Sequence, residues 1–417
     1  MKKISFHAFA HPCVTEKGHQ FIYHRSCQQA IESLNIPYYA YIPKNHELPF
    51  VPHNWIPHFP KPYDKSVKKE YLTSCMQLFG APSNDQRIFF IETLRRRDMR
   101  YFSLAALRKG KKTDQLWMLF RDDNLLSLHR DRLEVKIFLK LLGAKYRTNL
   151  KLFSDTDLLA RYFQEQLQLP FLVTPIPHLD LEPMESNHKN LSFGFSSSNS
   201  EEFAQQILGF ADEGNDQRPF PNQQHTRNAI NIPEDKAVNP KIQVKKLVCL
   251  FPGEPRREKG NAVVKRLLEL NDPAKMKTRL MLSEIMTSLN VQGGIDIEYF
   301  PNTLAREHYI AVIQKADIVL FPYEAEKYRY RSSGILVEAV GCGKMPLVPD
   351  GTWMASELRK FNLEDLIVDF STPLLFTKMW KLYHNEELRA KLKEMEKAYL
   401  AFHSTEAFAR MAQEILV

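Results

Sequence analysis

The sequence predicts an α/β protein with mostly parallel sheets. Short apolar runs alternate with stretches of helical periodicity before residue 177 and again after residue 244, which is typical of strand–helix–strand units. A length of 417 residues exceeds the usual size of one domain, so two domains and a connector are expected. With 44% hydrophobic and 25% charged residues, the chain has the composition of an ordinary globular protein.

The first 180 residues are predicted to form the amino-terminal domain. Strands are expected at 3–9, 38–42, 87–92, 115–120, 150–153 and 171–174. Helices are expected at 19–34, 64–79, 97–109, 128–142 and 155–167. The stretch 43–62 contains six prolines and few helical signals, so it is predicted to be a surface loop.

A polar segment, 181–243, is predicted to be a connector or an insertion with one helix at 201–211. The alternation resumes in a second domain, 244–389. Its strands are expected at 246–251, 296–299, 318–322, 345–349 and 366–369. Its helices are expected at 261–270, 275–288, 304–314, 334–340, 354–361 and 372–384. Two amphipathic helices, 386–402 and 404–415, follow, and 390–417 is expected to pack back on the amino-terminal domain.

The segment 321–358 carries the first predicted anion site. An apolar strand leads through a polar loop to a helix opened by Ser332, Ser333 and Gly334. Such a helix start presents free backbone N–H groups and the positive end of the helix dipole, which favour a diphosphate. Glu338, about one turn further on, could accept hydrogen bonds from sugar hydroxyls. Alternatively, the serines only cap the helix and Glu338 is solvated.

A second predicted anion site follows the strand at 246–251. It is a Gly/Pro turn that bears Arg256, Arg257 and Lys259 in front of the helix at 261–270. Cations at the carboxyl end of a strand can neutralise phosphate in the crevice of an open α/β sheet. We therefore expect the two anion sites to converge on one pyrophosphate pocket.

Charge and cysteine content limit the function classes. The net charge of +8 favours an anionic partner. Only 328–331 interleaves aromatic and basic residues, so no nucleic-acid partner is expected. The five cysteines show neither a CxxC pair nor metal-ligand spacing, so neither disulfides nor a metal are expected. Because the sequence has no apolar run of about 18 residues and no signal peptide, a cytoplasmic location is expected.

The densest basic run is Arg95–Lys112, which surrounds the apolar stretch 101–107. A basic helix with an apolar face suits an interfacial position. Peripheral contact with the inner face of a membrane, with a lipid-linked acceptor, is therefore one hypothesis. A solvated charged face is the alternative.

The carboxyl half resembles the GT-B glycosyltransferases, particularly the retaining, metal-independent members of glycosyltransferase family 4. The segment 256–260, RREKG, is similar to the family's Arg…Lys-Gly diphosphate motif, and 338–346 to its Glu-Ala…Gly-x-Pro helix and strand. In the amino half, Lys17-Gly18-His19 opens the first helix as the family's glycine loop does. The resemblance implies two Rossmann-like domains facing across a cleft, and sugar transfer from a nucleoside-diphosphate sugar to an unidentified acceptor without a cofactor.

The resemblance also implies roles for individual residues. The expected substrate-binding residues are Gly18, Arg256, Arg257, Lys259, Tyr330, Arg331, Ser332, Ser333, Gly334 and Glu338. Family members usually carry a glutamate eight positions before the residue matched by Glu338, and here that position is Tyr330. A non-catalytic nucleotide-sugar-binding protein of the same fold is therefore the alternative.

Charge builds up on the departing diphosphate during glycosyl transfer, so groups from both domains are needed around the sugar. The candidate catalytic residues of the amino half are His19, Arg121 and Asp122; His19 could instead pack near its helix start, and Asp122 could cap the next helix. Asp155-Thr156-Asp157 is similar to the metal-binding Asp-x-Asp of a different glycosyltransferase fold, but a helix cap at Ser154 or Asp155 explains it.

Overall fold

The computed structural model describes residues 3–15, 19–62, 66–92, 96–126, 129–177, 179, 246–252, 256–287 and 294–416. The connector expected at 181–243, with its helix at 201–211, lies outside these ranges. The proposed domain boundaries stay predictions.

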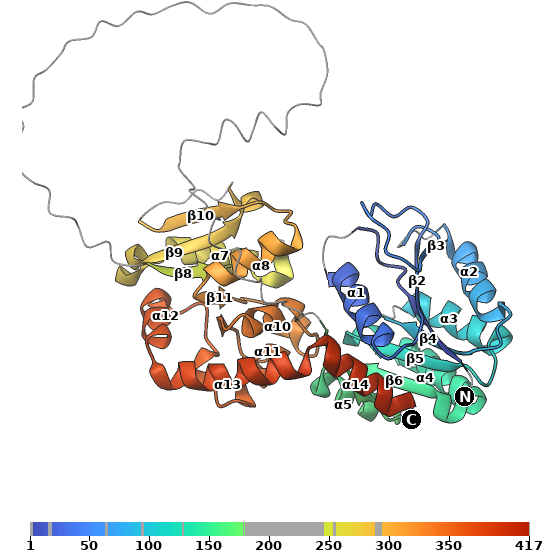
Figure 1. The fold of residues 1–417 in the computed structure, drawn as a ribbon. Coiled ribbons are helices and arrows are strands. Elements are labelled where there is room, and N and C mark those ends of the chain that lie inside the picture. Colours follow the sequence, from blue (N-terminus) through green and yellow to red (C-terminus); the bar gives the residue numbers. More distant parts are fainter. Residues whose placement is uncertain are drawn as a thin grey trace, which may run out of the picture. The chain divides into compact units, whose positions relative to one another are not determined.

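The amino half contains a parallel seven-stranded sheet in the order β3-β2-β1-β4-β5-β6-β7 (Figure 1). Its strands are β1 (Ile4–Phe9), β2 (Tyr38–Pro43), β3 (Trp55–Phe59), β4 (Gln86–Ile91), β5 (Gln115–Phe120), β6 (Leu150–Ser154) and β7 (Leu172–Val173). The chain runs outward from β1 to β3 and then returns to β4 on the other side of β1. This reversal creates a switch point between β1 and β4, the place where open α/β sheets form ligand crevices.

Helices cover both faces of this sheet. They are α1 (His19–Glu32), α2 (Lys68–Gly80), α3 (Arg96–Lys109), α4 (His129–Tyr146) and α5 (Asp157–Leu167), joined by short 3-10 helices at Asp123–Leu126 and Arg147–Asn149. Because strand side chains alternate between faces, Phe9 and Phe89 join the core under α2 to α5, whereas Phe6 and Phe90 join the core under α1.

The carboxyl half contains a parallel five-stranded sheet in the order β10-β9-β8-β11-β12. Its strands are β8 (Leu247–Leu250), β9 (Thr278–Ser283), β10 (Asp296–Phe300), β11 (Ile318–Leu320) and β12 (Met345–Leu347). The helices are α7 (Asn261–Glu269), α8 (Arg306–Lys315), α9 (Ala325–Tyr328), α10 (Gly334–Gly341), α11 (Trp353–Arg359), α12 (Leu375–Tyr383), α13 (Glu386–Phe402) and α14 (Thr405–Leu416). The strand order repeats that of the first sheet, so a second switch point lies between β8 and β11.

The last helix packs on the first half of the chain, as the sequence predicts. Helix α14 contacts α1, and Phe408 and Ala412 are buried in the same core cluster as Tyr23 and Phe90. The ring centroids of Phe90 and Phe408 lie 6.4 Å apart.

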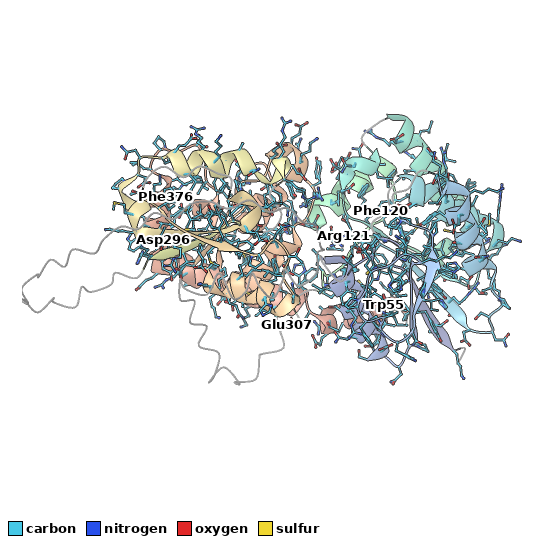
Figure 2. All side chains as sticks on the ribbon, turned by 90° about the horizontal axis from the view of Figure 1, so that it is seen from above. Trp55, Phe120, Arg121, Asp296, Glu307 and Phe376 are labelled. Atoms are coloured by element: carbon cyan, nitrogen blue, oxygen red, sulfur yellow. The ribbon has the colours of Figure 1, made fainter. Side chains whose placement is uncertain are left out.

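Two element predictions were wrong. The helix expected at 275–288 is strand β9, in which Leu280, Met281 and Leu282 are all buried. A strand buried on both faces has no polar alternation, so periodicity does not separate it from a helix. The loop expected at 43–62 contains edge strand β3, where Pro57 is tolerated. Trp55 of β3, labelled in Figure 2, is buried, and its indole N–H donates to Gln28 Oε1 at 2.9 Å.

A smaller difference concerns the strand expected at 366–369. There the structure has a 3-10 helix at Glu364–Leu366 and a single bridge between Val348 and Ile367.

Helix α3 does not offer its apolar side for contact with a membrane. Phe102, Ala105 and Ala106 are buried in the core beneath α2 to α5, so the apolar part of the basic run faces inward. No helix among the described residues is both long enough and apolar enough to cross a bilayer.

Candidate functional site

The two predicted anion-binding segments leave neighbouring strands at the same edge of the second sheet. Strands β8 and β11 are adjacent and parallel, with Cys249 opposite Ile318. The loops that follow them therefore both begin at the carboxyl edge, at the β8/β11 switch point. The two segments thus start side by side, and their convergence on one pyrophosphate pocket stays a prediction.

The two loops also touch. The backbone N–H of Glu324 donates to the carbonyl of Glu258 at 2.9 Å. Gly260 has φ +83°, and a Cβ added to it would lie 2.0 Å from the carbonyl oxygen of Pro322. Only glycine combines this backbone conformation with so close an approach. Gly260 thus sets the spacing between the loops.

The three cations of the first loop are held differently. Lys259 ends a 3-10 helix (Arg257–Lys259), is only 7% exposed, and its Nζ lies 5.8 Å from the ring centroid of Tyr323. The Arg256 side chain is half-exposed, 3.5 Å from Glu258. The Arg257 side chain is 96% exposed, with Glu324 at 3.8 Å. Lys259 is therefore the cation that the fold positions, whereas Arg257 projects into solvent.

The second loop ends in the expected helix start. Ser333 is the N-cap of α10, and its hydroxyl oxygen accepts a hydrogen bond from the N–H of Leu336 at 3.3 Å. The first i to i−4 bond of the helix runs from Val337 N–H to the carbonyl of Ser333 at 3.2 Å. The N–H groups of Gly334 and Ile335 precede that bond, so they are the amides that a helix start offers to an anion.

The neighbouring residues of this loop are engaged in protein contacts. Ser332 Oγ donates to Asp155 Oδ2 at 2.6 Å. Tyr330 stacks on Tyr162, with ring centroids 4.5 Å apart and planes at 26°. The guanidinium of Arg331 lies 5.3 Å from the ring centroid of Tyr328. The aromatic side chain of Tyr330 thus has a packing role.

Glu338 is buried inside the second half and paired with a cation that the sequence did not reveal. Its Oε1 accepts a hydrogen bond from Arg306 Nη1, and the side chain of Tyr309 lies beside the same carboxylate. Burial raises the pKa of Glu338, and Arg306 opposes that shift. Arg306 lies 32 residues earlier in the chain, at the start of α8, so no local pattern connects the two.

A network of buried charged and polar side chains follows successive strands of the first sheet. Glu92, Arg121 and Asp155 come directly after β4, β5 and β6. Arg121 donates from Nη1 to Glu92 Oε1 at 2.7 Å and from Nε to Asp155 Oδ2 at 3.0 Å. Glu92 Oε2 lies 3.1 Å from His24 Nε2 of α1. Figure 2 labels Arg121 beside Phe120, the last residue of β5.

Arg121 is therefore balanced by two carboxylates. Burial works against its charge, but Glu92 and Asp155 together raise the pKa of the guanidinium above its ordinary value. Burial also raises the pKa of Asp155, although Arg121 and Ser332 oppose the shift. The ion pairs with Glu92 and Asp155 therefore hold the Arg121 side chain in place.

The other candidates of the amino half are placed as follows. Asp122 Oδ1 accepts a hydrogen bond from Asn124 N–H at 3.1 Å, so it caps the 3-10 helix that follows. His19 begins α1, but its side chain and Gly18 lie outside the described part of the chain.

The helix cap expected at Ser154 or Asp155 is at Thr156 instead, whose hydroxyl accepts from Leu159 N–H at 3.0 Å. Sequence reasoning missed His24 and Glu92. One signal was available for Glu92: it is an acidic residue directly after a buried strand, where a carboxylate needs a partner.

Comparisons with known proteins show the fold. No family model matches the sequence, and no curated protein matches it. Among solved structures, sucrose-phosphate synthase from Thermosynechococcus elongatus is 11% identical with a TM-score of 0.56, and the match covers 100% of this chain and 98% of that one. The N-terminal domain of Candida albicans trehalose-6-phosphate phosphatase is 12% identical with a TM-score of 0.57, over 100% and 97%.

An alpha-glucosyltransferase in complex with UDP and DNA is 11% identical with a TM-score of 0.52, over 100% of this chain and 98% of that one. The chain has the GT-B fold. This confirms the predicted fold class of two Rossmann-like domains. At these identities the likeness shows the GT-B fold alone, so membership of glycosyltransferase family 4 stays a prediction.

Proposed function

We propose that the protein is a glycosyltransferase that moves a sugar from a nucleoside-diphosphate sugar to an acceptor. The observation that carries the proposal is the contact between two loops at the β8/β11 switch point, one of which bears Lys259 while the other leads on to the start of α10. A cation and free amides at one sheet edge suit a diphosphate. The alpha-glucosyltransferase of similar fold is itself in complex with UDP.

Each group has a role in the proposed reaction. Lys259 and the N–H groups of Gly334 and Ile335 stabilise the negative charge that develops on the departing diphosphate, without a metal. Arg256 also attracts the diphosphate, but its side chain is half-exposed, so water partly screens its charge. Arg306 orients Glu338 toward the ribose hydroxyls. Transfer proceeds with retention of configuration, as in the family that the motifs resemble.

The amino half is proposed to hold the acceptor. In this account Arg121 is a positioning residue, because it acts through Glu92 and Asp155. His19 and Asp122 remain the candidates for direct contact with the sugar or the acceptor.

A non-catalytic nucleotide-sugar-binding protein is the second candidate. The specific observation in its favour is Tyr330, which stacks on Tyr162 in place of the family glutamate. Such a protein would keep the diphosphate site and lack turnover.

A panel of nucleotides and nucleotide sugars distinguishes the two candidates. Nucleoside diphosphates are expected to raise the melting temperature more than the matching monophosphates, because the proposed site binds the diphosphate group and so gives diphosphates the lower Kd. A ligand at 100 times its Kd stabilises the folded state by about 2.7 kcal/mol. The purified enzyme is expected to hydrolyse one donor slowly, and Glu338→Ala is expected to abolish that hydrolysis.

Glu298→Ala is the matched control, since Glu298 is an ion-paired carboxylate on edge strand β10 of the same sheet. It is expected to hydrolyse the donor at the wild-type rate. Binding of a diphosphate without turnover of any donor would support the non-catalytic candidate. Failure of every nucleotide to stabilise the protein would count against both.

A further inference from the structure

Helix α4 has two apolar faces, and only one of them is used by the core. Val135, Leu139 and Leu142 are buried beneath it. On the opposite side, Leu133, Ile137 and Leu141 are 55%, 49% and 49% exposed. Their spacing of four residues places them in one row along the helix. We call these three residues the α4 stripe.

A row of exposed, large aliphatic side chains differs from the single exposed apolar residues that are normal on protein surfaces. Contiguous apolar area on a surface usually marks a place of contact with a partner or a membrane. The described part of this chain leaves the α4 stripe uncovered.

The surface around the α4 stripe is strongly basic. Lys136 and Lys140 lie along one side of the row, and neither forms an ion pair with another residue that the structure describes. Exposed Arg108, Lys109 and Lys112 at the end of neighbouring α3 add to this charge. In the segments 96–112 and 129–146 the sequence has twelve basic and three acidic residues.

The acidic residues of these segments do not offset that charge at the surface. Asp98 and Asp131 are buried. Glu134 is bound by Arg100, whose Nε lies 2.6 Å from its Oε1. The exposed face of α3 and α4 therefore presents cations and aliphatic groups together.

We propose that α4 docks the protein on an anionic lipid surface. The α4 stripe enters the boundary between headgroups and acyl chains, while Lys136 and Lys140 reach the lipid phosphates with their ammonium groups. An aliphatic row bordered by unpaired lysines matches such a surface in both polarity and charge. The basic run of α3 adds charge alone, because its apolar residues lie in the core.

The test is co-sedimentation of the full chain with vesicles. Vesicles of phosphatidylcholine with phosphatidylglycerol are expected to pellet the protein, and vesicles of phosphatidylcholine alone are not. The double change Lys136→Gln with Lys140→Gln is expected to weaken binding about 30-fold, on the order of fivefold for each lysine near an anionic surface. The triple change to serine at Leu133, Ile137 and Leu141 is expected to weaken it at least about tenfold.

Matched variants in the second half serve as controls. Met276, Ile285 and Leu374 are 70%, 52% and 52% exposed, and changing all three to serine is expected to leave vesicle binding unchanged. Lys381→Gln with Lys397→Gln is the control for the lysine pair. Circular dichroism and melting temperature establish that each variant is folded.

Three results would overturn the proposal. The first is equal recovery of the protein with neutral and anionic vesicles. The second is wild-type binding by the folded serine variant of the α4 stripe. The third is a dimer in solution that this variant turns into a monomer, without vesicle binding by either, which would mean that a second copy of the chain covers the stripe.

Discussion

Replacing Lys259 by methionine is expected to lower kcat/KM for the nucleotide-sugar donor by about 100- to 1,000-fold, the loss that follows removal of one preorganised donor from a charge-stabilising site. Lys259 is 7% exposed and is the last residue of a 3-10 helix that Gly260 ends, so its ammonium group is placed before the donor binds. Methionine keeps a similar length and the apolar contact with Tyr323, but it removes the charge. Steady-state kinetics with the donor identified by the nucleotide panel measure the effect.

Arg257→Met is the matched control for this change. The Arg257 side chain is 96% exposed, and its pairing with Glu324 at 3.8 Å is a surface contact. Water screens such a charge, so the loss is expected to stay below about threefold. Equal losses in the two variants would contradict the assignment of Lys259 as the cation that acts on the diphosphate.

Replacing Gly260 by alanine is expected to destabilise the protein by about 3 kcal/mol or more and to abolish donor binding in the fraction that folds. The added Cβ would lie 2.0 Å from the carbonyl oxygen of Pro322, and the φ of +83° is unfavourable for any side chain. The clash is with backbone, so the loops after β8 and β11 have to separate. Chemical denaturation gives the free energy of unfolding, and nucleotide titration gives the affinity.

Gly143→Ala provides the comparison for a glycine without these constraints. Gly143 lies within α4, and a Cβ added there would have no atom within 4 Å. Alanine is the better helix former, so this variant is expected to gain up to about 1 kcal/mol. If Gly260→Ala unfolded at the same denaturant concentration as Gly143→Ala, the tight contact between the loops would not exist in solution.

The alternation of strands and helices was enough to predict two mostly parallel sheets, although it missed β3 in the first sheet and β9 in the second. Each half follows the order of a doubly wound fold, and the two loops predicted to bind an anion follow β8 and β11. These features are local, because consecutive residues determine a strand, a Gly/Pro turn and a capped helix. The capping role of Ser333 follows from the same local chemistry.

The partners of the buried charges could not be predicted. Glu338 and Arg306 are 32 residues apart, and Arg121 is 29 residues from Glu92 and 34 from Asp155. Arg121 meets its partners because parallel strands bring their carboxyl ends to one edge, which depends on strand order. Glu338 and Arg306 lie on helices α10 and α8, which the tertiary fold brings together. Strand order is a tertiary property. Burial is a tertiary property too. Strand β9 is buried on both faces, so its sequence has no polar alternation that would distinguish it from a helix.

The exposure of the α4 stripe could not be predicted from the sequence either. The sequence suggested α3 as the membrane-facing element because its basic residues are clustered, but the core takes the apolar side of α3. Apolar residues lie on both sides of α4, so its sequence does not reveal which row the core will use. Only the packed structure separates the row under α4 from the row above it.

We infer that the Lys259 loop and the start of α10 hold a diphosphate. A crystal structure with the nucleoside diphosphate that most stabilises the protein tests it most directly. Phosphate oxygens are expected within hydrogen-bonding distance of Lys259 Nζ and of the N–H groups of Gly334 and Ile335. Phosphates bound elsewhere, with these three donors making no contact to them, would contradict it.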